Sequence, residues 1–260
     1  MTTKLLKIKD VFKALKIFFA TILFWSINIL IVVFAWLVAP VLALIMWNKN
    51  SAYQKWAKIW GKALLAIAAT QVRIEGLENI PKGIPIIYTP NHQSNLDWMI
   101  LLAVLPLPFR FIIKKELFRI PLFGSIIRNA GYFSLNREAK RKAYNTLIET
   151  IDVAKKDSIV IFPEGTRTWD GNLGKFKRGS LLLAFKVGSP IIPVAISGSF
   201  EIMPRHTWVI NPGIVKVKIG YPVSFGEHKE TKQERYQITL NKTRDAITTM
   251  LSELKRKRDD

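Results

Sequence analysis

The 260-residue sequence contains no cysteine and only three histidines. The absence of cysteine excludes disulfide bonds, thiolate metal sites and a covalent cysteine nucleophile, and it suits any reducing compartment. Acidic residues are also few, because 19 aspartates and glutamates stand against 39 lysines and arginines, for a net charge of +20. A chain this basic favours anionic partners, such as nucleic acid, acidic lipid headgroups, phosphorylated ligands or an acidic carrier protein.

Charge is absent from one long run, residues 17–47. A membrane-crossing helix needs roughly 20 apolar residues and two need about 40 plus a turn, so this run fits neither count well. Basic flanks prefer the cytoplasmic face, and lysines stand on both sides of the run: Lys4, Lys7, Lys9, Lys13, Lys16, Lys49, Lys55, Lys58 and Lys62. We expect a segment that enters one leaflet and returns, or lies tilted within it, with Pro40 as the break. An ordinary single crossing is the alternative, and a cleaved signal peptide does not fit the length of the run.

Residues 51–70 predict a second helix. Its lysines fall on one face, and Trp56 and Trp60 lie four residues apart on the neighbouring face. Lysines beside tryptophans suit the headgroup level of a membrane, whereas a helix packed on a domain with solvated lysines is the alternative. We therefore assign residues 1–70 to a membrane-anchoring segment that contains an embedded helical pair.

From residue 71 onward, short apolar runs alternate with helical patterns, which predicts an α/β domain over residues 71–260. The runs are continuous rather than alternating, so we expect a mostly buried sheet of about seven strands flanked by helices. The predicted strands are 72–77, 85–90, 109–114, 131–135, 158–163, 190–196 and 215–225, and the predicted helices lie near 96–105, 137–155, 178–188 and 231–257.

His92 follows one predicted strand, and Asp97 lies five residues further on. If the chain turns into a helix near Ser94 or Asn95, the carboxylate comes back beneath the imidazole. It can then accept a hydrogen bond from one ring nitrogen and leave the other free as a base. Because no cysteine exists and no nucleophile elbow surrounds Ser94, such a base would activate a hydroxyl group of a substrate, or water. A structural histidine–aspartate pair is the alternative.

Further polar residues follow other predicted strands, and ligands of open α/β sheets bind at this edge. They are Lys114, Arg137, Glu164 and Arg167. In the FPEGTR stretch, Pro163 and Gly165 shape a turn. Glu164 can there accept hydrogen bonds from ligand hydroxyls, and Arg167 offers a planar fork for phosphate. A β-turn with an internal Glu–Arg pair, and solvated cations elsewhere, are the alternatives.

Four blocks of the sequence resemble those of the glycerophospholipid acyltransferase family, in the same order and at similar separations. They are NHQSNLD (91–97), GYFSLNR (131–137), FPEGTR (162–167) and IIPVAISG (191–198). The similarity covers about residues 72–225. One departure is Asn136, where the family's second block often has aspartate before its arginine.

The resemblance implies a glycerolphosphate acyltransferase-like fold with a mixed sheet, and a reaction. His92 would take the proton of the sn-2 hydroxyl of lysophosphatidic acid, and Asp97 would orient His92. The acyl group would come from acyl-CoA or acyl carrier protein as co-substrate, with no acyl-enzyme, no other cofactor and no metal. The substrate-binding residues would be Lys114, Arg137, Glu164, Gly165, Thr166 and Arg167.

Three alternatives remain open at this stage: acylation of glycerol 3-phosphate or another lysophospholipid, a membrane thioesterase or other hydrolase, and a basic module that binds nucleic acid. The sequence has no recognised nucleic-acid motif, so we expect no nucleic-acid partner. We expect the basic residues to bind lipid and the thioester donor instead. We expect the protein at the inner (cytoplasmic) membrane, bound to the phospholipid bilayer, with its catalytic domain facing the cytoplasm.

Overall fold

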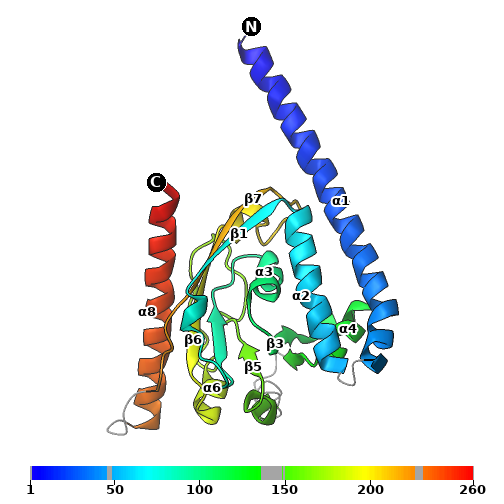
Figure 1. Ribbon diagram of the computed structural model, residues 1–260. Helices are drawn as coiled ribbons and strands as arrows, with labels where there is room; N and C mark the ends of the chain where they lie inside the picture. Colours follow the sequence, from blue (N-terminus) through cyan, green and yellow to red (C-terminus); the bar gives the residue numbers. More distant parts are fainter. Residues whose placement is uncertain (1, 46–48, 136–147, 149, 226–230, 260) are drawn as a thin grey trace.

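A seven-stranded sheet forms the centre of the protein (Figure 1). The computed structural model describes residues 2–45, 49–135, 148, 150–225 and 231–259. The strands are β1 (Thr70–Glu75), β2 (Ile87–Pro90), β3 (Phe109–Lys114), β4 (Phe133–Leu135), β5 (Ser158–Val160), β6 (Ile191–Ser197) and β7 (Gly213–Ile219). Their order in the sheet is β1-β7-β6-β2-β5-β3-β4. The predicted α/β fold with about seven strands is confirmed.

The sheet is mixed, because β6 pairs antiparallel with β7 while every other pair is parallel. Strands β2 to β6 therefore end at one common edge. The central strands β2 and β6 are buried along their whole length, which explains their continuous apolar runs. Polar side chains that follow these strands are consequently brought together.

Helices cover both faces of the sheet (Figure 1). On one face lie α2 (Lys49–Ile67), α3 (Leu96–Val104) and α4 (Phe123–Asn129); on the other lie α6 (Leu182–Val187) and α8 (Lys232–Asp259). The short helix α7 (Ser199–Ile202) follows β6, and the 3₁₀ turns are η1 (Leu77–Asn79) and η2 (Lys115–Arg119). This layering buries the apolar side chains on each face of the sheet.

The N-terminal helix α1 (Thr2–Ile45) corrects one prediction, because it continues through Pro40 instead of breaking there. A proline removes one backbone hydrogen bond, and here the turns on either side maintain the helix. At 1.5 Å per residue the helix is about 66 Å long, and its N-terminal half extends away from the domain (Figure 1). The stretch 14–38 is long and apolar enough to cross a membrane and is mostly exposed.

Helix α2 packs between α1 and α3, which corrects the expected place of its tryptophans. Trp60 is buried against Trp98 and Phe123 instead of facing lipid, and Trp56 contacts Phe34 of α1. The expected helix over 51–70 is present, but its aromatic face lies against protein. That α1 and α2 form a membrane-embedded pair, and that 1–70 and 71–260 are separate domains, stay predictions.

Candidate active site

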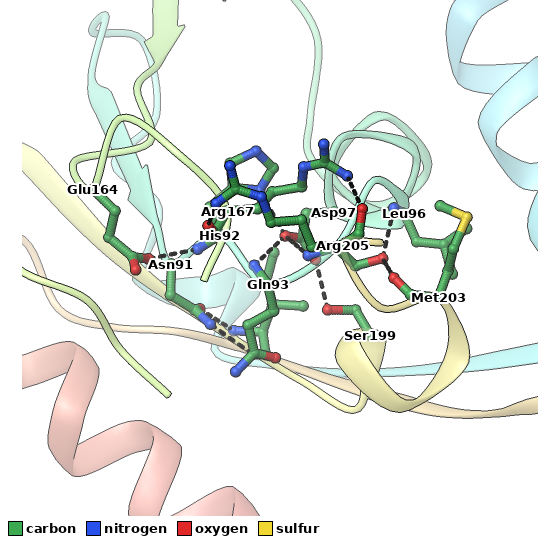
Figure 2. A network of polar contacts seen from close by, with 12 residues as sticks. Asn91, His92, Gln93, Leu96, Asp97, Glu164, Arg167, Ser199, Met203 and Arg205 are labelled. Atoms are coloured by element: carbon green, nitrogen blue, oxygen red, sulfur yellow. Dashed lines mark hydrogen bonds and ion pairs between the residues drawn. The ribbon is translucent and has the colours of Figure 1, made fainter. Parts of the chain in front are cut away.

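The imidazole of His92 contacts the carboxylate of Asp97, with 2.8 Å between Nδ1 and Oδ2 (Figure 2). His92 lies just beyond the end of β2, and α3 begins at Leu96, with Asn95 as its N-cap. The turn into the helix brings Asp97 back to the ring, as the sequence spacing predicts. The predicted geometry of this pair is therefore confirmed, and its catalytic role stays a prediction.

Asp97 is fully buried and accepts four hydrogen bonds. Its Oδ2 also accepts from the backbone N–H groups of Gln93 (2.7 Å) and Ser94 (2.8 Å). Its Oδ1 accepts from the hydroxyl of Ser199 at 2.6 Å. Several donors of this kind fix the orientation of the carboxylate. The carboxylate therefore presents a rigid acceptor to His92.

The other ring nitrogen of His92 is available for chemistry. The ring stacks on Phe162 with 3.9 Å between centroids, and its side chain is 15% exposed. Within the described residues, no hydrogen bond engages Nε2. The two nearby hydroxyls are occupied elsewhere, because Ser94 donates to a backbone carbonyl and Ser199 donates to Asp97. Neither of these two hydroxyls is therefore oriented as a nucleophile toward the imidazole.

Asn91 fixes the end of β2 beside the histidine. It is fully buried, accepts from the N–H of Ile196 at 2.7 Å and donates to the carbonyl of Ile196 at 2.9 Å. These side-chain bonds extend the pairing of β2 with β6 past the last strand residue. Asn91 therefore holds the backbone from which His92 projects, a role that the sequence did not indicate.

Glu164 lies beneath the histidine loop and is buried. One carboxylate oxygen accepts from the backbone N–H of His92 and the other from that of Gly174, each at 2.7 Å. Burial raises the pKa of this carboxyl to about 7, against the lowering effect of the two N–H bonds. The sequence suggested a contact with a ligand hydroxyl. The geometry favours a positioning role, in which Glu164 joins the loop of His92 to the loop of Gly174.

Two arginines lie beside the histidine–aspartate pair (Figure 2). Arg167 is half-buried, and the next residue, Thr168, donates its backbone N–H to the carbonyl of His92 at 2.9 Å. Arg205 comes from the loop between α7 and β7, and its Nη1 donates to the carbonyl of Arg167 at 2.6 Å. Burial and the neighbouring guanidinium of Arg205 lower the pKa of Arg167. Sequence reasoning found Arg167 and missed Arg205, which follows a helix instead of a strand.

The remaining predicted residues lie less centrally. Gly165 has a φ of +68°, a left-handed conformation that glycine adopts without strain, and Thr166 is exposed beside it. Lys114 ends β3, is exposed, and pairs with Glu116 at 3.5 Å. Arg137 lies outside the described residues.

The part of the chain that the structure describes shows no cluster of metal-ligating side chains. Across the described ranges, no group of three or more histidine, aspartate and glutamate side chains is placed to hold a metal ion. That the reaction needs no metal or cofactor stays a prediction.

Comparison with known proteins agrees with this fold and these motifs. A family model described as Acyltransferase matches residues 71–197. A 1-acyl-sn-glycerol-3-phosphate acyltransferase of Pseudomonas aeruginosa is 30% identical over 195 residues, which cover 74% of this chain and 73% of that protein. The chain belongs to the glycerophospholipid acyltransferase family. The family predicted from the four sequence blocks is therefore confirmed.

Other members of the family match different shares of the chain. The crystal structure of the 1-acyl-sn-glycerophosphate (LPA) acyltransferase PlsC from Thermotoga maritima superposes with a TM-score of 0.74 at 28% identity, covering 89% of this chain and 96% of that one. The chloroplastic 1-acyl-sn-glycerol-3-phosphate acyltransferase LPAT1 of Arabidopsis thaliana is 38% identical over 170 residues, 64% of this chain and 47% of the relative. The chain thus matches about half the length of this chloroplast relative.

Proposed function

We propose that this family member is an enzyme that transfers a fatty acyl group from a thioester to the sn-2 hydroxyl of lysophosphatidic acid, which gives phosphatidic acid. The donor would be acyl-CoA or acyl carrier protein. The enzyme would work at the cytoplasmic surface of a membrane.

The observation that carries the proposal is the His92–Asp97 pair, whose second imidazole nitrogen forms no hydrogen bond within the described part of the chain. In a serine hydrolase the histidine would contact a nucleophilic side chain. Here Ser94 and Ser199 are tied to other acceptors, so the hydroxyl that His92 activates would belong to a substrate.

The reaction then runs in one transfer. Nε2 of His92 removes the proton from the acceptor hydroxyl while Asp97 stabilises the resulting imidazolium. The alkoxide oxygen attacks the thioester carbonyl, the new C–O ester bond forms, and the C–S bond breaks. The thiolate of CoA or of the carrier protein leaves and takes up the proton that His92 carried. The histidine returns to its neutral form, so no acyl-enzyme intermediate is needed.

An anionic acceptor is supported by the arginines beside the base. Arg167 can form two parallel hydrogen bonds with phosphate oxygens, a geometry that lysine lacks. The P. aeruginosa and A. thaliana relatives bear the name 1-acyl-sn-glycerol-3-phosphate acyltransferase, which describes an acceptor with this phosphate. We therefore favour lysophosphatidic acid over acceptors with larger headgroups.

The membrane part of the proposal is supported by α1. Its 14–38 stretch is apolar, long enough to cross a bilayer and mostly exposed. Because the acceptor is a lipid and the donor head is soluble and charged, a catalytic site at the membrane surface would meet both. The lysines on either side of the apolar run favour the cytoplasmic side.

A transfer assay tests the function. The purified full-length protein is incubated in lipid nanodiscs with acyl-CoA or acylated carrier protein and with lysophosphatidic acid, glycerol 3-phosphate or a lysophospholipid with a larger headgroup. We expect phosphatidic acid as the main product. Fatty acid release without an acceptor would instead identify a thioesterase, and preference for another acceptor would assign a different substrate within the family.

A further inference from the structure

Arg205 and Arg167 are bonded to each other's backbone across the active site. Nη1 of Arg205 donates to the carbonyl of Arg167 at 2.6 Å, and Nη1 of Arg167 donates to the carbonyl of Arg205 at 3.4 Å. The two bonds join the loop that follows Phe162 to the loop that follows α7. The two side chains therefore cross, each guanidinium lies against the backbone of the other arginine, and both residues lie beside His92 (Figure 2).

This arrangement brings two positive charges to the active site. Both side chains are half-buried, and neither forms an ion pair with a carboxylate in the part of the chain that the structure describes. The pKa of Arg167 is lowered by burial and by Arg205, which reports their mutual repulsion, although Asp97 opposes this effect. Asp97 is itself occupied by four hydrogen bonds. Two positive charges on crossed side chains favour binding of an anion beside them.

Arg205 is also fixed in place before any ligand binds. Its guanidinium lies over the ring of Trp169, 4.0 Å from the centroid, and this ring stacks on His206. A cation held over an aromatic ring loses little further conformational freedom on binding. Trp169 is 65% exposed, so its ring supports the guanidinium of Arg205 at the surface and not in the core.

The loop that carries Arg205 is attached to helix α1 as well. The backbone N–H of Ile210 donates to the hydroxyl of Thr21 at 3.1 Å, and the indole N–H of Trp25 donates to the carbonyl of Trp208 at 2.8 Å. The rings of Trp25 and Trp208 contact each other edge to face. The loop is therefore supported on one side by Arg167 and on the other by the apolar helix.

We propose that Arg205 is a specificity-determining residue that forms, with Arg167, a two-guanidinium clamp for a phosphate monoester. This inference rests on the proposed function and deepens it by naming a residue that recognises the phosphate headgroup. A monoester phosphate carries nearly two negative charges at neutral pH. A phosphodiester headgroup carries one, and an uncharged glycerol headgroup carries none. Two guanidinium groups balance the charge of a phosphate monoester. With a phosphodiester or an uncharged headgroup they leave positive charge unneutralised.

The test compares Arg205→Ala, Arg205→Lys and the control Arg73→Ala, which removes an arginine from the exposed side of β1 far from the clamp. Each full-length protein is assayed with lysophosphatidic acid, with a lysophospholipid that has a phosphodiester headgroup, and with monoacylglycerol. Loss of one charge-assisted hydrogen bond corresponds to about 1.5–3 kcal/mol, or roughly 10- to 150-fold. We expect kcat/KM for lysophosphatidic acid to fall by about this factor in Arg205→Ala, to fall less in Arg205→Lys, and to stay unchanged in Arg73→Ala. For the other two acceptors, kcat/KM should fall much less in Arg205→Ala.

A binding measurement separates the clamp from the reaction. Titration of glycerol 3-phosphate into each protein, followed by calorimetry, should give a Kd at least tenfold weaker for Arg205→Ala and unchanged for Arg73→Ala. If wild-type protein binds glycerol 3-phosphate through Arg205 but transfers no acyl group, the proposed function fails and the clamp stands. If Arg205→Ala lowers the rates with all three acceptors equally, or leaves them and the Kd unchanged, the clamp is wrong even though the transfer activity stands.

Discussion

Ser199 donates its hydroxyl to Oδ1 of Asp97 at 2.6 Å, while His92 contacts the other oxygen of the same carboxylate. The serine begins α7, and Gly198 separates it from the end of β6. A residue that follows β6 therefore orients the carboxylate of Asp97, which follows β2. A carboxylate held at both oxygens cannot rotate away from the imidazole. Ser199 is therefore a positioning residue that acts through Asp97.

Ser199→Ala should lower kcat by about tenfold, as expected for one charge-assisted hydrogen bond, while the KM for lysophosphatidic acid changes little. Ser199→Thr should restore part of the rate because it retains the hydroxyl. Ser252→Ala is the matched control, since its hydroxyl bonds only within the exposed surface of α8. Steady-state kinetics of the three variants make the comparison. A rise in KM with unchanged kcat would assign Ser199 to substrate binding.

The raised pKa of Glu164 predicts that the stability of the protein depends on pH. The pKa of its carboxyl is about 7 in the folded protein and about 4.3 in an unfolded chain. Between these two pKa values the folded state binds more protons than the unfolded state. The contribution of Glu164 to the free energy of unfolding therefore falls as pH rises from about 4.5 to 7. Thermal unfolding of wild type and Glu164→Gln across this range measures the effect. The wild type should lose stability relative to the variant with rising pH, and a constant difference would contradict the account.

The attachment of the Arg205 loop to α1 predicts that the apolar helix affects substrate binding. Thr21→Val removes the acceptor for the N–H of Ile210, and a net hydrogen bond is worth about 1 kcal/mol, or roughly fivefold in KM for lysophosphatidic acid. Thr248→Val is the matched control, because its hydroxyl bonds only to its own helix. Equal KM values in both variants would show that the contact with α1 does not hold the loop.

The orientation of α1 can be tested with cysteines, since the chain has none. Thr3→Cys and Ser252→Cys mark the two ends of the protein. If α1 lies tilted in one leaflet with its lysine-rich start at the cytoplasmic surface, an impermeant thiol reagent should label neither position in intact cells. Both should be labelled after the membrane is opened. Labelling of position 3 alone from outside would demonstrate a single crossing.

Local relationships could be predicted from the sequence. His92 and Asp97 lie within one turn of chain, so their spacing and the start of a helix sufficed to bring them together. The strands were predicted because their buried runs are continuous. Ser199 and Arg205 were missed because they lie far from His92 in the chain, and only the order of strands in the sheet brings their loops to it.

The errors in the predicted surroundings of α2 have a common physical cause. The pattern of lysines beside Trp56 and Trp60 distinguishes an apolar face from a polar one, but it does not identify what covers the apolar face. In the structure that cover is Trp98, Phe123 and α1, so Trp60 lies against protein. Lys58 likewise donates to the carbonyl of Leu105 at the end of α3 instead of pointing to lipid. Tertiary packing decided both positions.

The central claim is that His92 is the base in acyl transfer, and single-turnover transfer by His92→Ala tests it most directly. The variant should keep its circular dichroism spectrum and its affinity for glycerol 3-phosphate, since neither the fold nor the arginine pair depends on the imidazole. General base catalysis contributes about 10²- to 10⁴-fold, so the rate of phosphatidic acid formation should fall by at least about a hundredfold. A His92→Ala protein that folds, binds glycerol 3-phosphate and transfers the acyl group at close to the wild-type rate would contradict the account.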